Sequence, residues 1–138
     1  MKIAIRYYSK GGNTKKIADA VSKAVGVEAK PVSEPLTENT DILFLCTAPY
    51  KFNIDPAVTA FISGIDVAVG KTVLFSTSAS VRPIGKYLVK LFAEKKIPLE
   101  KEEFFCPGKF LMLHNGRPNE KDCQAAVDFA RKFTEQGE

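Results

Sequence analysis

The residues best suited to binding chemistry form a glycine-rich stretch near the N-terminus, residues 7–14, which reads YYSKGGNT. An apolar run at residues 3–5 precedes it, and apolar residues at helical spacing follow it over residues 17–25. The stretch therefore lies where a strand turns into a helix, and the first N–H groups of a helix attract anions because they lack internal partners. Gly11 and Gly12 let the backbone approach a ligand closely. The stretch predicts a phosphate-binding loop, with candidate contacts at Ser9, Lys10, Gly11, Gly12, Asn13 and Thr14.

Two further loops carry residues suited to a flat heterocycle. The first, residues 47–54, places Tyr50 and Phe52 beside Pro49, and aromatic rings stack on planar ligands. The second, residues 76–82, offers small residues and hydroxyls that let the edge of a ring approach the backbone. The alternative is structural, with Tyr50 packed on Pro49 at the surface and Phe52 in the core. The candidate contacts are Ala48, Pro49, Tyr50, Lys51, Phe52 and Asn53 in the first loop, and Thr77, Ser78, Ala79, Ser80 and Arg82 in the second.

Strand and helix patterns alternate along the chain. Residues 27–32 are a weak strand candidate suited to a sheet edge, because Pro31 removes a backbone donor. Residues 42–46 are a continuous apolar run, typical of a central parallel strand, and residues 71–77 contain a second buried strand. Residues 33–40 are polar and too short for a full crossover helix.

Three helix patterns follow the apolar run at residues 42–46. Asp55 is an expected N-cap, followed by proline at the first helical position, and residues 83–98 carry a second helical pattern that ends at a proline. Asn119 is expected to cap the last helix. Residues 103–106 and 110–113 are two short apolar runs separated by a Pro-Gly pair, and they form either one interrupted strand or a strand and a loop.

This alternation predicts an α/β fold. We expect a doubly wound, five-stranded parallel sheet of order 2-1-3-4-5 with helices on both faces. In that order the carboxyl ends of the first and third strands are neighbours at the switch point. The loops that begin at Ser9 and Thr47 should then converge on one crevice, with the loop after Thr77 beside it. Together the three loops describe a site for an aromatic ligand with a phosphate tail.

Length and composition narrow the class of protein. The 138 residues are 45% hydrophobic and 26% charged, which suits one domain over residues 1–138. No apolar run approaches the roughly 20 residues that cross a bilayer, and no signal-peptide core is evident, so we expect a cytoplasmic protein without a membrane partner. Three widely spaced cysteines indicate neither a disulfide framework nor a metal site. The net charge of +4 is scattered, which argues against nucleic acid.

Other functions of α/β folds lack their signatures here. A response-regulator receiver needs acidic residues at the end of the first strand, where residues 7–9 read YYS. A dinucleotide fold needs Gly-x-Gly-x-x-Gly and an acid at the end of the second strand, and residues 30–32 supply no acid. The nucleoside triphosphatase loop Gly-x-x-x-x-Gly-Lys-[Ser/Thr] does not occur. No paired carboxylates or nucleophile–base set indicates hydrolysis.

The chain resembles the flavodoxin family, and more narrowly its short-chain members. The flavodoxin phosphate loop reads [Thr/Ser]-x-[Thr/Ser]-Gly-Asn-Thr, and residues 9–14 match it at the first, fourth, fifth and sixth positions. Gly11 departs at the third position, so one phosphate hydrogen bond is missing, and we expect the charge of Lys10 to offset it. The match extends more coarsely over nearly the whole chain. The resemblance implies non-covalently bound flavin mononucleotide (FMN), a flavodoxin-like fold and electron transfer through the flavin ring.

Three functions follow from this resemblance. The first is an electron carrier between a reductase and an acceptor, and the short loops favour it because they leave little material for a substrate lid. The others are an FMN-dependent NAD(P)H or quinone reductase and a flavin-bearing accessory subunit, so enzyme activity stays open. Ordinary flavodoxins are acidic around their flavin, but here Lys10, Lys51 and Arg82 lie in or beside the three loops, with Asp55 nearby. We therefore expect redox partner proteins with an acidic docking surface.

Overall fold

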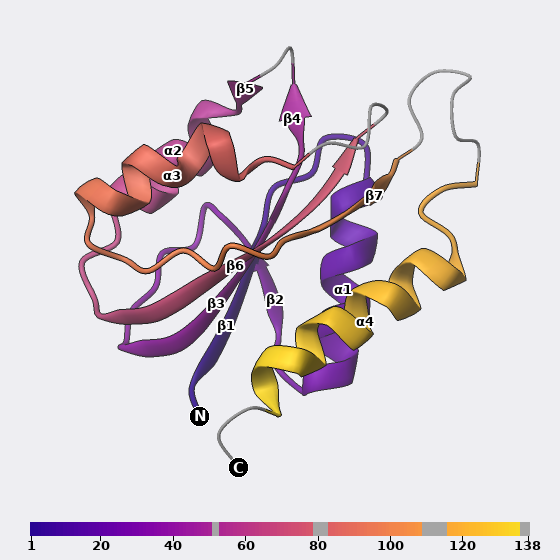
Figure 1. Cartoon of the computed structure of the whole chain (residues 1–138), viewed down its shortest axis with the longest axis horizontal. Coiled ribbons are helices and arrows are strands. Elements are labelled where there is room, and N and C mark those ends of the chain that lie inside the picture. The colour runs from indigo at the N-terminus through magenta and orange to yellow at the C-terminus, as the bar shows by residue number, and fades with distance from the viewer. Residues whose placement is uncertain (51–52, 79–82, 109–115, 136–138) are drawn as a thin grey trace.

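Five parallel strands form one sheet in the part of the chain that the structure, a computed structural model, describes: residues 1–50, 53–78, 83–108 and 116–135 (Figure 1). The strand order is β2-β1-β3-β6-β7. A separate two-stranded hairpin, β4 and β5, projects beyond the carboxyl end of β3. The strands are β1 Ile3–Tyr7, β2 Ala29–Pro31, β3 Thr40–Thr47, β4 Pro49–Tyr50, β5 Asn53–Ile54, β6 Val69–Ser78 and β7 Phe104–Pro107. The helices are α1 Asn13–Val25, α2 Pro56–Ser63, α3 Gly85–Glu94 and α4 Glu120–Thr134.

The observed order confirms the predicted 2-1-3-4-5 arrangement once the hairpin is left out of the count. β1 pairs with β2 on one side and with β3 on the other, so the chain reverses its direction of winding at β1. Tyr7 lies opposite Cys46, and Cys46 lies opposite Phe75, so three strands end close to one level. The loops that leave this end are those predicted to form the crevice.

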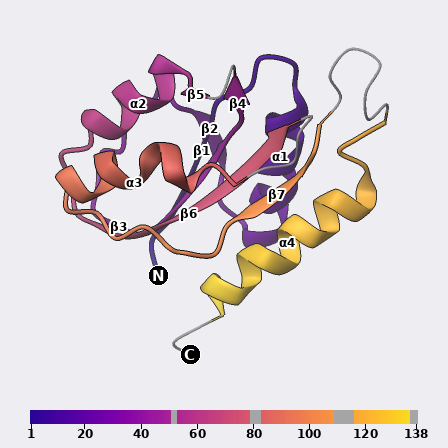
Figure 2. The ribbon, with the colours of Figure 1, turned by 45° about the horizontal axis from the view of Figure 1, so that its top comes forward.

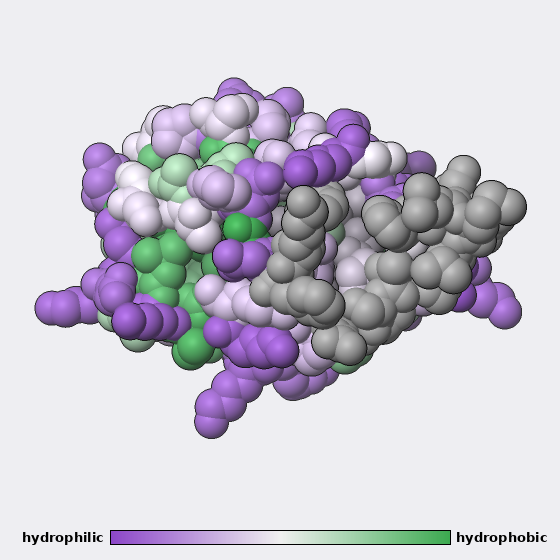
Figure 3. All heavy atoms as spheres, turned by 90° about the horizontal axis from the view of Figure 1, so that it is seen from above, coloured by the Kyte–Doolittle hydropathy of each residue, from purple (hydrophilic) through white to green (hydrophobic). Residues whose placement is uncertain are grey.

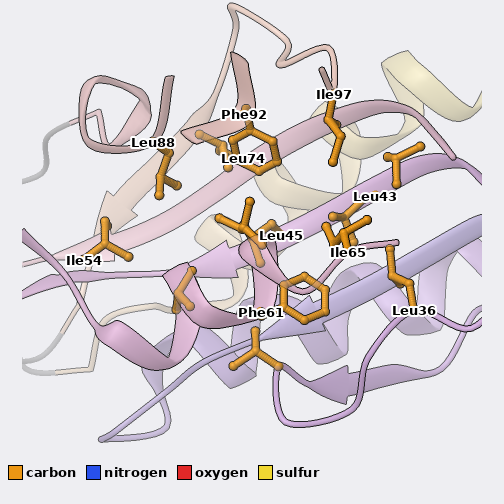
Figure 4. Close-up of a cluster of buried hydrophobic side chains, with 14 of the residues drawn as sticks. Leu36, Leu43, Leu45, Ile54, Phe61, Ile65, Leu74, Leu88, Phe92 and Ile97 are labelled. Carbon is orange, nitrogen blue, oxygen red and sulfur yellow. The ribbon is translucent and has the colours of Figure 1, made fainter. Parts of the chain in front are cut away.

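Helices cover both faces of the sheet (Figures 1 and 2). α1 and α4 pack on one face, where the Phe75 ring lies edge-on to Phe44 and Phe129, each with a ring-centroid distance of 5.5 Å. α2 and α3 pack on the other face over a second cluster of hydrophobic side chains, mostly aliphatic, which Figure 4 shows between the helices and the sheet. β3 is buried over nearly its whole length because it contributes to both clusters.

Side-chain caps explain where three of the helices begin. Asp55 and Asn119 cap α2 and α4, as the sequence predicted. Asp55 accepts a hydrogen bond from the N–H of Ala57, and Asn119 forms a capping box with Asp122. α3 begins at Gly85, two residues later than the pattern indicated. Its cap comes from a distant residue, because the carboxylate of Glu103 accepts the N–H groups of Ile84 at 2.6 Å and Gly85 at 3.1 Å.

The segment between β2 and β3 contains no helix, in agreement with its short polar sequence. Arg6 holds it against the sheet instead. The buried guanidinium donates to the carbonyl of Glu34 at 2.8 Å and of Pro35 at 3.3 Å. Val32 and Leu36 then fill the adjoining part of the core. A side chain on β1 thus replaces part of the cover that a crossover helix normally provides.

The last strand is short, and β7 corresponds to the first of the two apolar runs. Residues 110–113 lie outside the described residues, so the choice between one interrupted strand and a strand with a loop stays open.

Cys46 is fully buried in the core, as expected for a packing residue, and burial raises its pKa well above the ordinary thiol value. Among the described residues, no cluster of potential ligands could hold a metal ion, and no helix is long and apolar enough to cross a membrane.

Candidate functional site at the carboxyl ends of the strands

The predicted phosphate loop is an open turn between β1 and α1. Gly12 has φ of 91°, in the left-handed region that favours glycine, and its N–H donates to Ser9 Oγ at 3.0 Å. A Cβ added at Gly11 or Gly12 would meet no atom within 4 Å. The hydroxyl of Ser9 thus shapes the turn, and the two glycines leave space above it.

The N-terminus of α1 has no side-chain cap. α2, α3 and α4 all have acidic or amide side chains at this position, namely Asp55, Glu103 and Asn119. Among the described residues, no acceptor receives the backbone N–H of Thr14 or Lys15. These donors and the dipole of a 13-residue helix face the open turn, which is the arrangement that binds phosphate in other α/β proteins.

The floor of the turn is fixed by residues from the carboxyl ends of two other strands, β6 and β7. Thr14 Oγ1 and Thr77 Oγ1 are 2.9 Å apart, and both residues are buried. Gly108, just after β7, passes so close that a Cβ there would lie 3.0 Å from Asn13 Nδ2 and 3.2 Å from the Cβ of Thr77. The start of α1 is therefore joined to the ends of β6 and β7.

A polar contact joins the same turn to α2. Tyr8 donates its hydroxyl to Asp55 Oδ2 at 3.1 Å, and Lys10 Nζ lies 3.7 Å from the same oxygen. The N–H of Ala57 holds the pKa of Asp55 below its ordinary value, and Tyr8 and Lys10 act in the same direction against partial desolvation. Part of the positive charge of Lys10 is thus compensated, so this residue contributes less charge to a phosphate than its sequence position indicated.

The second predicted loop leaves β3 and turns back as the hairpin. Ala48 is buried, Pro49 pairs with Ile54, and the Asn53 side chain accepts the N–H of Ile54 at 2.8 Å. These contacts define the hairpin backbone that would present Tyr50. Three of the predicted contacts in this loop lie beyond what the structure describes, namely Lys51, Phe52 and the side chain of Tyr50.

The third predicted loop begins at the end of β6. The hydroxyl of Thr77 faces α1 through its contact with Thr14, so Thr77 supports the phosphate loop. Buried side-chain oxygens without a partner among the described residues occur close by, at Thr47, Ser76 and Ser78. Such groups are uncommon in native proteins. These three lie near the expected position of the ring of a ligand, whereas a fourth, on Thr72, lies near the start of β6. Three predicted contacts lie outside the described residues, namely Ala79, Ser80 and Arg82.

Figure 3 looks onto this end of the sheet. Hydrophobic residues visible in this view gather on the side of α2 and α3, with hydrophilic side chains around them.

Lys16 donates to the carbonyl of Pro118 at 2.5 Å, and Arg117 binds both oxygens of Asp122, at 2.5 and 2.7 Å. The first contact fastens the segment before α4 to α1, and the second is an ion pair at the start of α4.

Sequence reasoning missed three residues that shape the site. Tyr8 contacts Asp55, which lies 47 residues along the chain, and Glu103 accepts from Ile84 and Gly85, which precede it by 19 and 18 residues. A local sequence pattern does not reveal contacts between residues so far apart. Gly108 had a signal, because it follows proline directly after a strand, a position typical of a tight turn. The sequence correctly predicted that Ser9, Thr47 and Thr77 lie at the same end of the sheet, because that prediction depends only on strand order. All three lie at its carboxyl end.

Solved structures with this architecture are similar over the whole chain. The fold is flavodoxin-like. The chain shares 18% identity with oxidised flavodoxin 2 from Bacillus cereus, covering 99% of each chain with a TM-score of 0.71. It shares 14% with a short-chain flavodoxin associated with a PDU bacterial microcompartment, covering 100% of each with a TM-score of 0.72. For a flavodoxin from Streptococcus pneumonia TIGR4 the values are 15% identity, 97% and 98% coverage and a TM-score of 0.67.

No protein-family model and no curated protein sequence matches the chain. The likeness to flavodoxins thus rests on the arrangement of helices and strands and not on sequence identity. The turn after β1 contains the pair Gly11-Gly12, and the sheet order places β3 between β1 and β6, with the carboxyl ends of all three strands at one end of the sheet.

Proposed function

We propose that residues 1–138 form one flavodoxin-like domain that binds FMN and carries electrons between protein partners. The observation that carries this proposal is the uncapped N-terminus of α1 beside the Gly11-Gly12 turn, at the switch point of the sheet. A phosphate placed there would accept the N–H groups that have no acceptor among the described residues.

The residues present fit the ligand in type and position. Ser9, Asn13 and Thr14 lie at the phosphate end, and Thr14 is held in place by Thr77. The hairpin that carries Tyr50 and the end of β6 at Ser78 would adjoin the flavin ring. FMN supplies a ring that takes up and releases electrons. The chain's own part is to hold the phosphate, orient the ring and set the charge around it.

The carrier function is favoured over a reductase by the short connections around the site. The hairpin strands have two residues each, and α2 starts directly after Asp55. A steady-state assay with NAD(P)H and a quinone separates the two functions. If the protein is a carrier, it turns over slowly by itself, and turnover becomes faster when a separate reductase is added. Rapid turnover by the protein alone indicates that it is itself a reductase. Slow turnover with or without a reductase points to the accessory subunit.

The proposed partner is a redox protein with an acidic docking surface. The net charge of +4 and the presence of Lys10, Lys51 and Arg82 in or beside the loops support this. Purification provides a first test of the cofactor, because the protein should be yellow and release FMN on denaturation. A colourless protein that does not take up added FMN contradicts the proposal.

A further inference from the structure

A groove of about 590 Å³ lies beside the phosphate loop, on the side of β2. Its walls come from the end of β1 and the start of the loop, from the end of β2, and from the first two turns of α2. The volume lies within the roughly 300–1,000 Å³ of small-molecule sites. The residues used below are Tyr8, Ser9, Ser33, Ala57, Ala60 and Phe61.

The groove exists because the connection between β2 and β3 forms no helix. Arg6 draws the segment down onto the sheet through the carbonyls of Glu34 and Pro35, and Leu36 is buried with it. The space above the ends of β1 and β2 is therefore bounded by α2 and by Pro31 to Ser33. The helix on the opposite wall presents small residues, since Ala57 and Ala60 both line the groove and both are exposed.

The walls suit a planar aromatic group. Tyr8 is held at its hydroxyl by Asp55 at 3.1 Å, so its ring forms a fixed wall, and Phe61 lies on the α2 side. Aromatic and small aliphatic walls favour flat, apolar ring systems. Ser9 and Ser33 add hydroxyls that can hydrogen-bond to ring nitrogens or to a ribose.

The groove is continuous with the phosphate loop, because Ser9 belongs to both. The loops expected to hold the flavin ring follow β3 and β6, whereas the groove lies beside β2, and β1 separates the two. Lys10 reaches Asp55 at the start of α2, so an ion pair lies where the loop meets the groove. The site thus offers a place for an aromatic group on each side of a phosphate-binding turn.

We propose that this groove binds the adenosine half of flavin adenine dinucleotide (FAD), so that the protein accepts FAD as well as FMN. The inference rests on the proposed flavin function and extends it to a larger ligand. FAD is the ligand class indicated because it carries aromatic groups at both ends and phosphates between them.

The test compares FMN and FAD binding by flavin fluorescence titration of the full chain. In the wild type, FAD should bind no weaker than FMN. Ala60→Phe fills the groove from an exposed helix position, and it should weaken FAD about tenfold relative to FMN, the equivalent of roughly 1.4 kcal/mol. Ala93→Phe, at an exposed alanine on α3 that does not line the groove, is the matched control and should leave the ratio unchanged. Ala57→Leu replaces Ala60→Phe if the latter does not fold.

Each outcome decides between the claims. Weaker binding of FAD than of FMN by the wild type overturns the groove proposal and leaves the FMN proposal intact. An unchanged ratio of the two affinities in Ala60→Phe also overturns it, because the adenosine then lies elsewhere. Binding of neither flavin overturns the proposed function, and the groove proposal with it.

Discussion

The hydroxyl oxygens of Thr14 and Thr77 lie 2.9 Å apart in the interior, although 63 residues separate them in the sequence. Thr14 begins the helix that follows the phosphate loop, and Thr77 lies near the end of β6. The contact fixes the phosphate end of the candidate site relative to the strand whose loop is expected to adjoin the flavin ring.

Removing one of these hydroxyls should destabilise the fold and weaken FMN binding. Thr77→Val leaves Thr14 Oγ1 buried without this partner, which costs on the order of 1–3 kcal/mol in the free energy of unfolding. The double variant with Thr14→Val should lose less than the sum of the single variants, because no partner is left behind. Urea unfolding measures these differences. Thr37→Val, at an exposed threonine, is the control and should change stability by less than about 0.5 kcal/mol. Additive losses in the double variant would show that the two hydroxyls are not coupled.

The two glycines of the phosphate loop should respond differently to alanine. Gly12 has φ of 91°, so Gly12→Ala strains the backbone by roughly 1–2 kcal/mol even though space is available. Gly11 is not among the glycines with positive φ, and its Cβ position is also open. Gly11→Ala should therefore have little effect on stability. Thermal unfolding of both variants measures the difference, and equal losses would mean that the turn does not have the conformation described here.

The start of α3 should depend on Glu103. Glu103→Ala removes the acceptor for the N–H groups of Ile84 and Gly85, and loss of a helix cap costs roughly 0.5–2 kcal/mol. Hydrogen exchange should show the loss of protection at the start of α3. The matched control is Glu102→Ala, which removes an exposed ion pair with Lys132 and should cost less than about 1 kcal/mol. Unchanged protection in Glu103→Ala would contradict the long-range cap.

The positive charge near the loops should set the redox potential of the bound flavin. Positive charge stabilises an anionic reduced ring, by on the order of 1 kcal/mol or less for each solvent-screened charge. Replacing Lys51 and Arg82 with neutral residues should therefore make the second reduction potential more negative in a potentiometric titration. Lys23→Gln, in the last turn of α1, is the control. An unchanged potential in the first variant would show that these side chains do not act on the ring.

The sequence predicted the elements whose signals are local. The apolar run at residues 42–46 identified the central strand, and Asp55 and Asn119 identified two helix starts because their caps act within a few residues. The alternation of strands and helices predicted a parallel sheet, and the common order of five-stranded doubly wound sheets gave the strand order. The start of α3 differed from the prediction because its cap, Glu103, lies on a distant segment. The hairpin β4–β5 was missed because strands of two residues give no periodic signal.

The candidate site was predictable to the extent that its parts lie at strand ends. The sequence named Ser9 and Thr77, but it could not show that Thr77 faces Thr14, because the face on which a side chain lies depends on packing across the sheet. The contact of Lys10 with Asp55 likewise depends on how α2 approaches β1. A local sequence pattern therefore could not predict that Asp55 partly compensates the charge of Lys10.

The claim that the loop after β1 holds the phosphate of FMN is tested most directly by comparing FMN with riboflavin, which lacks the phosphate. Fluorescence titration of the purified protein should give FMN binding at least about tenfold tighter than riboflavin, because hydrogen bonds to a charged group contribute roughly 1.5–3 kcal/mol. Equal affinity for the two flavins, or no binding of FMN, would contradict the account.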